Sequence, residues 1–183
     1  MNNGIFDFIG DNSGDWEVAS MQVLKGEPME IVSHIKRIPS SLAKSKEGIW
    51  TLKGVVSNLR YTDKEDKDKL IAIQEDLGRP KATLAAFIPI RKSDAWWNLA
   101  QDERRGIMEN KSLHTQTGMK YLPAIARKLF HSRDIGEPFD FLTWFEYAPS
   151  DANAFEELLE ALRKTEEWKY VDREIDIRLI KLE

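Results

Sequence analysis

Residues 111–147 read KSLHTQTGMKYLPAIARKLFHSRDIGEPFDFLTWFEY, and the last nine of them, FDFLTWFEY, contain five aromatic side chains. Side chains two positions apart lie on the same face of a strand, so one face of this predicted strand carries Phe139, Phe141, Thr143, Phe145 and Tyr147. Such a face has to line a core or a pocket. Thr143 is its only small polar side chain, which fits a pocket wall and equally a core with one satisfied hydroxyl.

The residues on both sides of this strand carry strand and helix patterns in turn. Residues 82–91 are apolar enough for a strand without a wet face, and a helix is predicted over about residues 94–109. Another helix begins at residues 149–151, and residues 170–182 alternate as a strand. The order strand, helices, strand, strand, helix, strand predicts a ferredoxin-like unit, in which helices cover one face of an antiparallel sheet.

The residues before position 82 repeat part of this order. Residues 5–9 and 16–24 predict two strands, joined as a hairpin by the turn at residues 10–14. Residues 49–61 predict a third strand. The segment between them, residues 28–46, reads as polar and irregular, and His34 within it has no assigned role.

A mixed charge run at residues 62–69 predicts the solvated face of a helix that ends at Gly78. The helix expected at the start of this half is missing or irregular. We therefore expect an α+β fold made of two ferredoxin-like halves, a reduced one at residues 1–81 and a complete one at residues 82–183. Two such sheets facing each other would form one compact α+β barrel.

Composition restricts the partners of the chain. It has 27 basic and 31 acidic residues, and the net charge of −4 argues against a nucleic-acid backbone or an anionic membrane as the main partner. No cysteine is present, which excludes disulfides, thiolate ligands, iron–sulfur clusters and thiol nucleophiles. The amino terminus has no signal-peptide pattern, and no run of about 18 apolar residues occurs. We expect a soluble, cytoplasmic protein.

Three histidines limit the metal chemistry. The sequence has no HExxH motif, no histidine pair at i,i+4 and no GxSxG motif. One histidine opposite an open position is the pattern of a histidine-ligated haem. His114 is the candidate ligand, although a lone histidine is ordinarily a surface or core residue. His131 reads as structural.

Arg127 is the candidate for the opposite side of such a site. It follows His114 by 13 residues, which on one unbroken helix would place the two about 140° apart. Gly118 and Pro123 are expected to break this segment, so that both residues can flank a ligand. A lone arginine is more often a surface cation, but the stem of Arg127 starts from the apolar run at residues 122–126.

The chain resembles the chlorite dismutase family over nearly its whole length, and its short, dimeric, haem b branch in particular. The resemblance lies in Trp96-Trp97, in the segment Asp102-Glu-Arg-Arg105, in His114 and in Tyr121-Leu-Pro-Ala-Ile-Ala-Arg127. It implies haem b as the cofactor, chlorite or another small oxyanion as the substrate, and a homodimer. The reaction would decompose chlorite to chloride and dioxygen, with O–O bond formation at the haem iron.

The resemblance also implies roles for individual residues. His114 would be the axial iron ligand and Arg127 the distal catalytic residue, because relatives that decarboxylate coproporphyrin lack such an arginine. Glu167, or alternatively Glu166, would accept the N–H of the ligand histidine and raise its basicity. The other cofactor contacts implied are a basic residue near a propionate (Lys92), two tryptophans beside the haem (Trp96 and Trp97), the distal residues Gln74 and Leu122, and the strand hydroxyl of Thr143.

Three other functions fit the residues. One is a haem peroxidase-like or porphyrin-handling enzyme with another substrate, and the second is a non-enzymatic haem carrier or sensor that uses the same histidine. The third is an α+β barrel without a cofactor, since composition and periodicity alone require neither haem nor chlorite.

Overall fold

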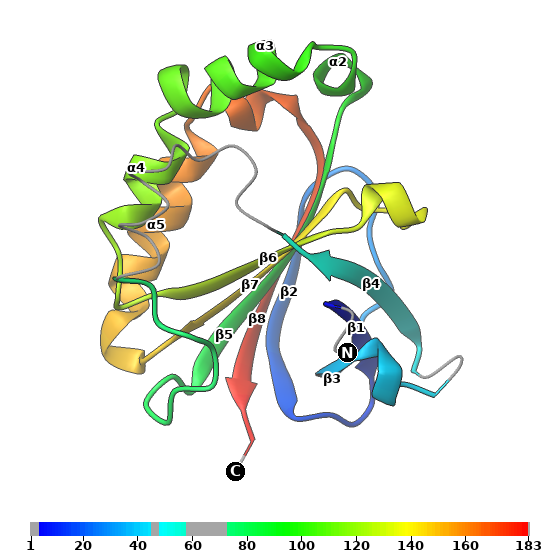
Figure 1. Cartoon of the computed structure of the whole chain (residues 1–183). Helices are drawn as coiled ribbons and strands as arrows, with labels where there is room; N and C mark the ends of the chain where they lie inside the picture. The colour runs from blue at the N-terminus through cyan, green and yellow to red at the C-terminus, as the bar shows by residue number, and fades with distance from the viewer. Residues whose placement is uncertain (1–3, 45–47, 58–72, 183) are drawn as a thin grey trace.

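Eight strands are present in the computed structural model, which describes residues 4–44, 48–57 and 73–182 of the chain (Figure 1). The amino-terminal half carries β1 (Ile5–Asp11), β2 (Trp16–Lys25), β3 (His34–Pro39) and β4 (Trp50–Val56). The carboxy-terminal half carries β5 (Leu84–Lys92), β6 (Ala126–His131), β7 (Phe141–Tyr147) and β8 (Val171–Lys181). They close into one antiparallel barrel in the order β1-β3-β2-β8-β5-β7-β6-β4.

The two halves place their strands in the same spatial order, β4-β1-β3-β2 and β8-β5-β7-β6. They meet along two unequal seams. β2 and β8 pair along most of their length, from Trp16 opposite Lys181 to Lys25 opposite Glu174. In the described part of the chain, β4 and β6 pair through two positions, Val55 with His131 and Val56 with Phe130. The fold is therefore a mixed α/β fold with an antiparallel barrel.

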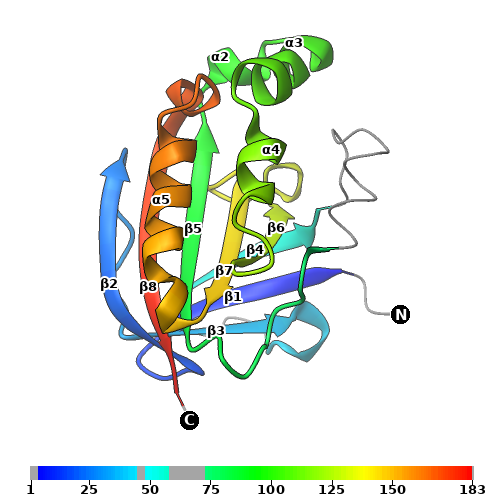
Figure 2. The ribbon, with the colours of Figure 1, turned by 90° about the vertical axis from the view of Figure 1, so that its left-hand side faces the viewer.

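The helices lie over the outer face of the carboxy-terminal strands, where α4 and α5 cross in front of β8, β5 and β7 (Figure 2). Their bounds are α2 (Asp94–Trp97), α3 (Gln101–Arg105), α4 (His114–Met119) and α5 (Ala152–Arg163). A π-helical turn, η2 (Gly106–Lys111), continues α3, and 3₁₀ turns occur at η1 (Ser40–Leu42), η3 (Arg133–Ile135), η4 (Pro149–Asp151) and η5 (Glu167–Tyr170). No helix within the described ranges is long and apolar enough to cross a lipid bilayer.

The sheet formed by the carboxy-terminal strands separates two hydrophobic cores. The interior of the barrel is filled by one face of these strands together with residues of β1 and β3, including Phe8, Ile35, Phe87, Trp144 and Ile177. The outer face packs against α5, whose buried stripe is Phe155, Leu158, Leu159 and Leu162. The aromatic strand therefore faces both cores, with Leu142 and Trp144 inside the barrel and Phe145 and Tyr147 outside it.

The structure corrects four expectations. The predicted hairpin is wrong, because β1 pairs with β3 and β4, whereas β2 pairs with β3 and β8. β3 lies in the segment expected to be irregular. The helix expected over residues 94–109 is divided into α2, α3 and η2. Phe139 precedes β7 and packs in the barrel interior rather than with Phe141.

Two further expectations lie outside the described residues. They are the charged helix at residues 62–69 and the end of the strand predicted over residues 49–61. The predicted end of that helix at Gly78 lies within the described residues and is wrong, because residues 74–78 are not helical.

Candidate functional site

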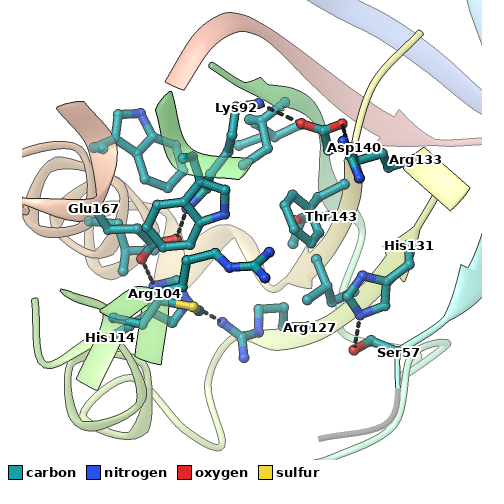
Figure 3. Close-up of a pocket in the computed structure, with 18 of the residues that line it drawn as sticks. Ser57, Lys92, Arg104, His114, Arg127, His131, Arg133, Asp140, Thr143 and Glu167 are labelled. Atoms are coloured by element: carbon teal, nitrogen blue, oxygen red, sulfur yellow. Dashed lines mark hydrogen bonds and ion pairs between the residues drawn. The ribbon is translucent and has the colours of Figure 1, made fainter. Parts of the chain in front are cut away.

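A cavity of about 190 Å³ lies between the outer face of the carboxy-terminal strands and the helices that cover it (Figure 3). Its apolar wall comes from β5, β6, β7 and α5 and includes Ile88, Ile90, Leu129, Phe145 and Leu159. Seven of the residues singled out from the sequence line it, namely Lys92, Trp96, Trp97, His114, Arg127, Thr143 and Glu167. The cavity is thus an apolar slot with charged groups at its ends.

His114 is the first residue of α4, and the chain enters this helix through an unusual backbone turn. The preceding residue, Leu113, has φ 49° and ψ 39°, the left-handed conformation that side chains other than glycine rarely adopt. This turn separates η2 from α4 and directs the imidazole toward Glu167.

Glu167 forms a hydrogen bond with the Nδ1 side of the His114 imidazole. Its Oε2 lies 2.8 Å from His114 Nδ1, and its Oε1 accepts a hydrogen bond of 2.5 Å from Lys92 Nζ. A carboxylate can only accept hydrogen bonds, so Nδ1 carries the proton and Nε2 presents its lone pair on the other side of the ring. Burial alone would raise the pKa of Glu167, but His114 and Lys92 hold it well below its usual range.

Lys92 has a different partner from the haem propionate that the resemblance implies. Its side chain is buried, with Nζ on Glu167 and 3.7 Å from the centre of the Trp96 ring. Burial lowers the pKa of Lys92, and the charge of Glu167 opposes that shift. The exposed Glu166 is paired with Lys169 instead, so Glu167 is the acid that contacts His114.

Arg127 meets His114 on the side of the free lone pair. Its Nη1 lies 3.4 Å from His114 Nε2, so α4 and β6 bring the two residues into direct contact, whereas the sequence led us to expect them on either side of a ligand. Desolvation lowers the pKa of Arg127, and Glu167 and Glu109 oppose that shift by their charges. The guanidinium lies next to His114 Nε2, in the space that a metal bound to this nitrogen would need.

Gln74 and Leu122 lie beside the main cavity rather than in its wall. They line a smaller neighbouring cavity of about 20 Å³ that also contacts Arg127. Gln74 Nε2 donates to the backbone oxygen of Arg127 over 2.6 Å. The amide therefore contacts the main chain of Arg127.

The opposite end of the cavity holds residues that the sequence analysis missed. Asp140 accepts hydrogen bonds from the backbone N–H of Lys92 (2.7 Å) and from Trp97 Nε1 (3.0 Å). Burial raises the pKa of Asp140, while these bonds and the charge of Arg133 oppose that shift. The guanidinium of Arg133 lies 4.0 Å from the centre of the Trp97 ring. Asp140 was overlooked because it stands between two aromatic residues of the strand.

Two other cavity residues carried weak signals in the sequence. Arg104 lies in the segment Asp102–Arg105, and its side chain extends into the cavity (Figure 3). His131, expected to be structural, lines the cavity with Nε2 2.7 Å from Ser57 Oγ. Both positions depend on how β4, β6 and α3 come together, which no local pattern reveals.

The fold and the cavity define a class of protein, an α/β barrel in which a carboxylate-backed histidine faces an arginine beside an apolar slot. The chain belongs to the chlorite dismutase family, whose model matches residues 3–181. A dimeric chlorite dismutase structure from Nitrobacter winogradskyi is 52% identical, with a TM-score of 0.89 over 97% of this chain and 99% of that one.

More distant relatives share part of the chain. A chlorite dismutase from Ideonella dechloratans is 33% identical over an alignment of 127 residues. The alignment covers 66% of this chain and 41% of that relative. A chlorite dismutase from Candidatus Nitrospira defluvii, solved in complex with imidazole, is 29% identical, with a TM-score of 0.57 over 71% of this chain and 54% of that one. The chain thus spans about half the length of these two longer relatives.

Proposed function

We propose that this chain is a haem b-dependent chlorite dismutase, which converts one chlorite ion into one chloride ion and one dioxygen molecule. The observation that carries the proposal is the juxtaposition of His114 and Arg127. A histidine whose Nδ1 is fixed by a buried carboxylate offers Nε2 as a metal ligand. An arginine beside that nitrogen offers a fork of donors for a small oxyanion.

The residues of the cavity fit haem b by their chemistry. A flat, largely apolar macrocycle suits a slot lined by Ile88, Ile90, Leu129 and Phe145, and His114 would supply a nitrogen ligand to its iron. The distance of 3.4 Å between Arg127 Nη1 and His114 Nε2 leaves no space for an ion between them. Binding of haem therefore requires the arginine side chain to rotate away from His114.

Each residue then has a defined task. When bound, haem supplies the iron at which the chlorine–oxygen bond of chlorite breaks and the oxygen–oxygen bond forms. Glu167 keeps the proton on His114 Nδ1 and so orients Nε2, and Lys92 fixes the other oxygen of that carboxylate. Arg127 binds the anion and retains it in the cavity, which limits the escape of oxidising chlorine species.

We also propose the finer architecture that the resemblance implies. The repeated strand order supports two ferredoxin-like halves, at residues 1–81 and 82–183, with the helices of the first half reduced. The similarity to a dimeric chlorite dismutase supports a homodimer. Sedimentation or light scattering of the purified protein checks the dimer, and a monomer at micromolar concentration would contradict it.

The deciding experiment measures oxygen with a Clark electrode after chlorite is added to the haem-loaded protein. We expect one dioxygen per chlorite. A Soret band without oxygen release would refute the reaction and leave a peroxidase-like, porphyrin-handling or carrier role. No Soret band after incubation with haemin would refute the cofactor itself.

A further inference from the structure

Among the described residues, the hydrogen bonds and ion pairs of the Arg79 side chain involve no residue that lines the main cavity, yet they hold the turn that leads to Arg127. Its Nη1 donates to the backbone oxygen of Pro123 (3.0 Å), and its Nη2 donates to that of Ala124 (2.7 Å) and, at 3.4 Å, to that of Glu146. Nη1 also pairs with Glu75 at 3.0 Å. One guanidinium therefore links three carbonyls from two segments of the carboxy-terminal half.

The turn held by Arg79 leads directly into the strand that carries Arg127. α4 begins at His114 and ends at Met119, and β6 begins at Ala126, so residues 120–125 connect the helix that starts with His114 to the strand that carries Arg127. The third carbonyl, that of Glu146, belongs to the β7 residue that pairs with Ala126. Arg79 thus fastens the entrance of β6 to β7 one residue before Arg127.

Two further hydrogen bonds attach residues 74–79 to β6 and β7 near the same turn. Gln74 Nε2 donates to the backbone oxygen of Arg127, and the backbone N–H of Gly78 donates to Glu146 Oε2 over 2.5 Å. Residues 74–79 therefore bind both β6 and β7 at this end of the barrel. Arg79 supplies the cationic part of this attachment, where hydrogen bonds to carbonyls are stronger than those of neutral donors.

We propose that Arg79 is a positioning residue for Arg127, acting by clamping the turn at residues 121–125 to the end of β7. This proposal rests on the proposed function, because it assigns the clamp to the placement of the anion-binding arginine. An arginine suits the task because its rigid fork reaches several carbonyls at once, which a lysine ammonium cannot reproduce in the same geometry.

The chain offers a matched control in Arg173. Its Nε donates to the backbone oxygen of Glu27 (2.9 Å) and its Nη2 to that of Pro28 (3.0 Å). Arg173 therefore clamps two successive carbonyls as Arg79 does, but in a segment that does not lead to the cavity. Arg173→Ala removes the same kind of contact without touching the turn before β6.

The first test uses oxygen release by the haem-loaded protein. We expect Arg79→Ala to retain the Soret band and to lower kcat/KM roughly 10- to 100-fold, because a displaced donor stabilises the reacting anion poorly. In the Arg127→Ala background the same change should cost nothing further. Arg173→Ala should leave kcat/KM unchanged. A multiplicative loss in the double variant, or an equal loss in Arg173→Ala, would overturn the proposal.

The second test needs neither haem nor turnover. Amide hydrogen exchange of the haem-free protein should become faster at residues 121–127 in Arg79→Ala. In Arg173→Ala it should become faster around residues 25–30 and near Phe139, whose ring centre lies 4.3 Å from the Arg173 guanidinium, and stay unchanged at residues 121–127. If the unaltered protein releases no oxygen, the proposed function fails, and unchanged exchange at residues 121–127 would separately reject the clamp. Should Arg79→Ala fail to fold, Arg79→Lys keeps the charge and should show the same localised change.

Discussion

The two faces of the carboxy-terminal strands differ in composition and in task. The inner face, with Phe87, Trp144 and Ile177, is fully buried and shared with the amino-terminal half. The outer face replaces some apolar side chains with polar ones, such as Thr143, and lies beneath the helices that cover the cavity. Along one strand, residues that point inward stabilise the barrel, and the residues next to them point outward and line the cavity. Single substitutions can therefore change stability and the site separately.

The inner face should show the largest effect on stability. Trp144 is completely buried, and its Nε1 donates to Glu146 Oε1 over 2.9 Å. We expect Trp144→Ala to lower the free energy of unfolding by about 3–5 kcal/mol, because it leaves a cavity and removes one hydrogen-bond donor from the buried Glu146 carboxylate. Urea unfolding followed by circular dichroism measures this. Trp97 is partly exposed in α2, on the outer side of the sheet. Trp97→Ala should therefore lower the free energy of unfolding by less than Trp144→Ala does. Equal losses for the two variants would contradict the division between the faces.

The outer face should show the next largest effect, and it should appear in turnover. Arg127→Ala removes the cation beside His114 Nε2, and we expect oxygen release to fall about 100-fold while the protein keeps haem and its stability. Loss of activity after repeated chlorite additions should also occur sooner. Lys128→Ala, one residue along β6, is the control. Unchanged turnover and durability in Arg127→Ala would refute the role of this arginine.

A third prediction concerns the carboxylate that backs the histidine. The pKa of Glu167 is lowered in the folded state, so its contribution to stability is present above its unfolded pKa, roughly 4.3, and is lost as the pH falls below that value. The free energy of unfolding should therefore decrease below about pH 5, with a contribution from this group of up to about 1.4 kcal/mol per pH unit.

Glu167→Gln tests this contribution because it removes the titrating group and keeps the shape. The variant should have a flatter pH dependence of stability between about pH 3 and 5. Glu166→Gln should retain the dependence of the unaltered protein, since Glu166 pairs with Lys169 in water-exposed surroundings. Thermal unfolding over this pH range provides the data, and identical curves for both variants would contradict the assignment.

The smallest effect is expected at Thr143. Its side chain lines the cavity from the outer face of β7, so Thr143→Val should change the free energy of unfolding by less than about 1 kcal/mol. The affinity of the Thr143→Val variant for haemin, measured by absorbance titration, should change little. A large loss of stability would instead support the alternative of a satisfied core hydroxyl.

The sequence was sufficient where the contacts repeat locally. β5, β7, α5 and β8 were predicted because apolar side chains recur along them with the period of a strand or a helix. β3 was missed because its segment, HIKRIP, buries only Ile35. The hairpin prediction failed because the turn at residues 10–14 leads β2 to β8, whose paired residues are 149 to 165 positions away, instead of back to β1.

The site divides in the same way. The positions of His114, Arg127 and Glu167 followed from the family resemblance, whereas their mutual distances depend on the closed barrel. The pairing of Lys92 with Glu167 joins residues 75 positions apart, and the contact of Asp140 with Trp97 spans 43 positions. No periodicity connects residues at such separations, so the partner of Lys92 could not be inferred from its neighbours.

The unequal seams of the barrel affect how the molecule can open. Within the described residues, β2 and β8 share a long ladder, whereas β4 and β6 share two residue pairs and the bond from Ser57 N–H to the Leu129 oxygen (2.9 Å). Local unfolding follows the route that loses the fewest contacts. Leu129 and His131 of β6 line the cavity, so we expect opening between β4 and β6 to change the cavity wall while the β2–β8 ladder stays paired.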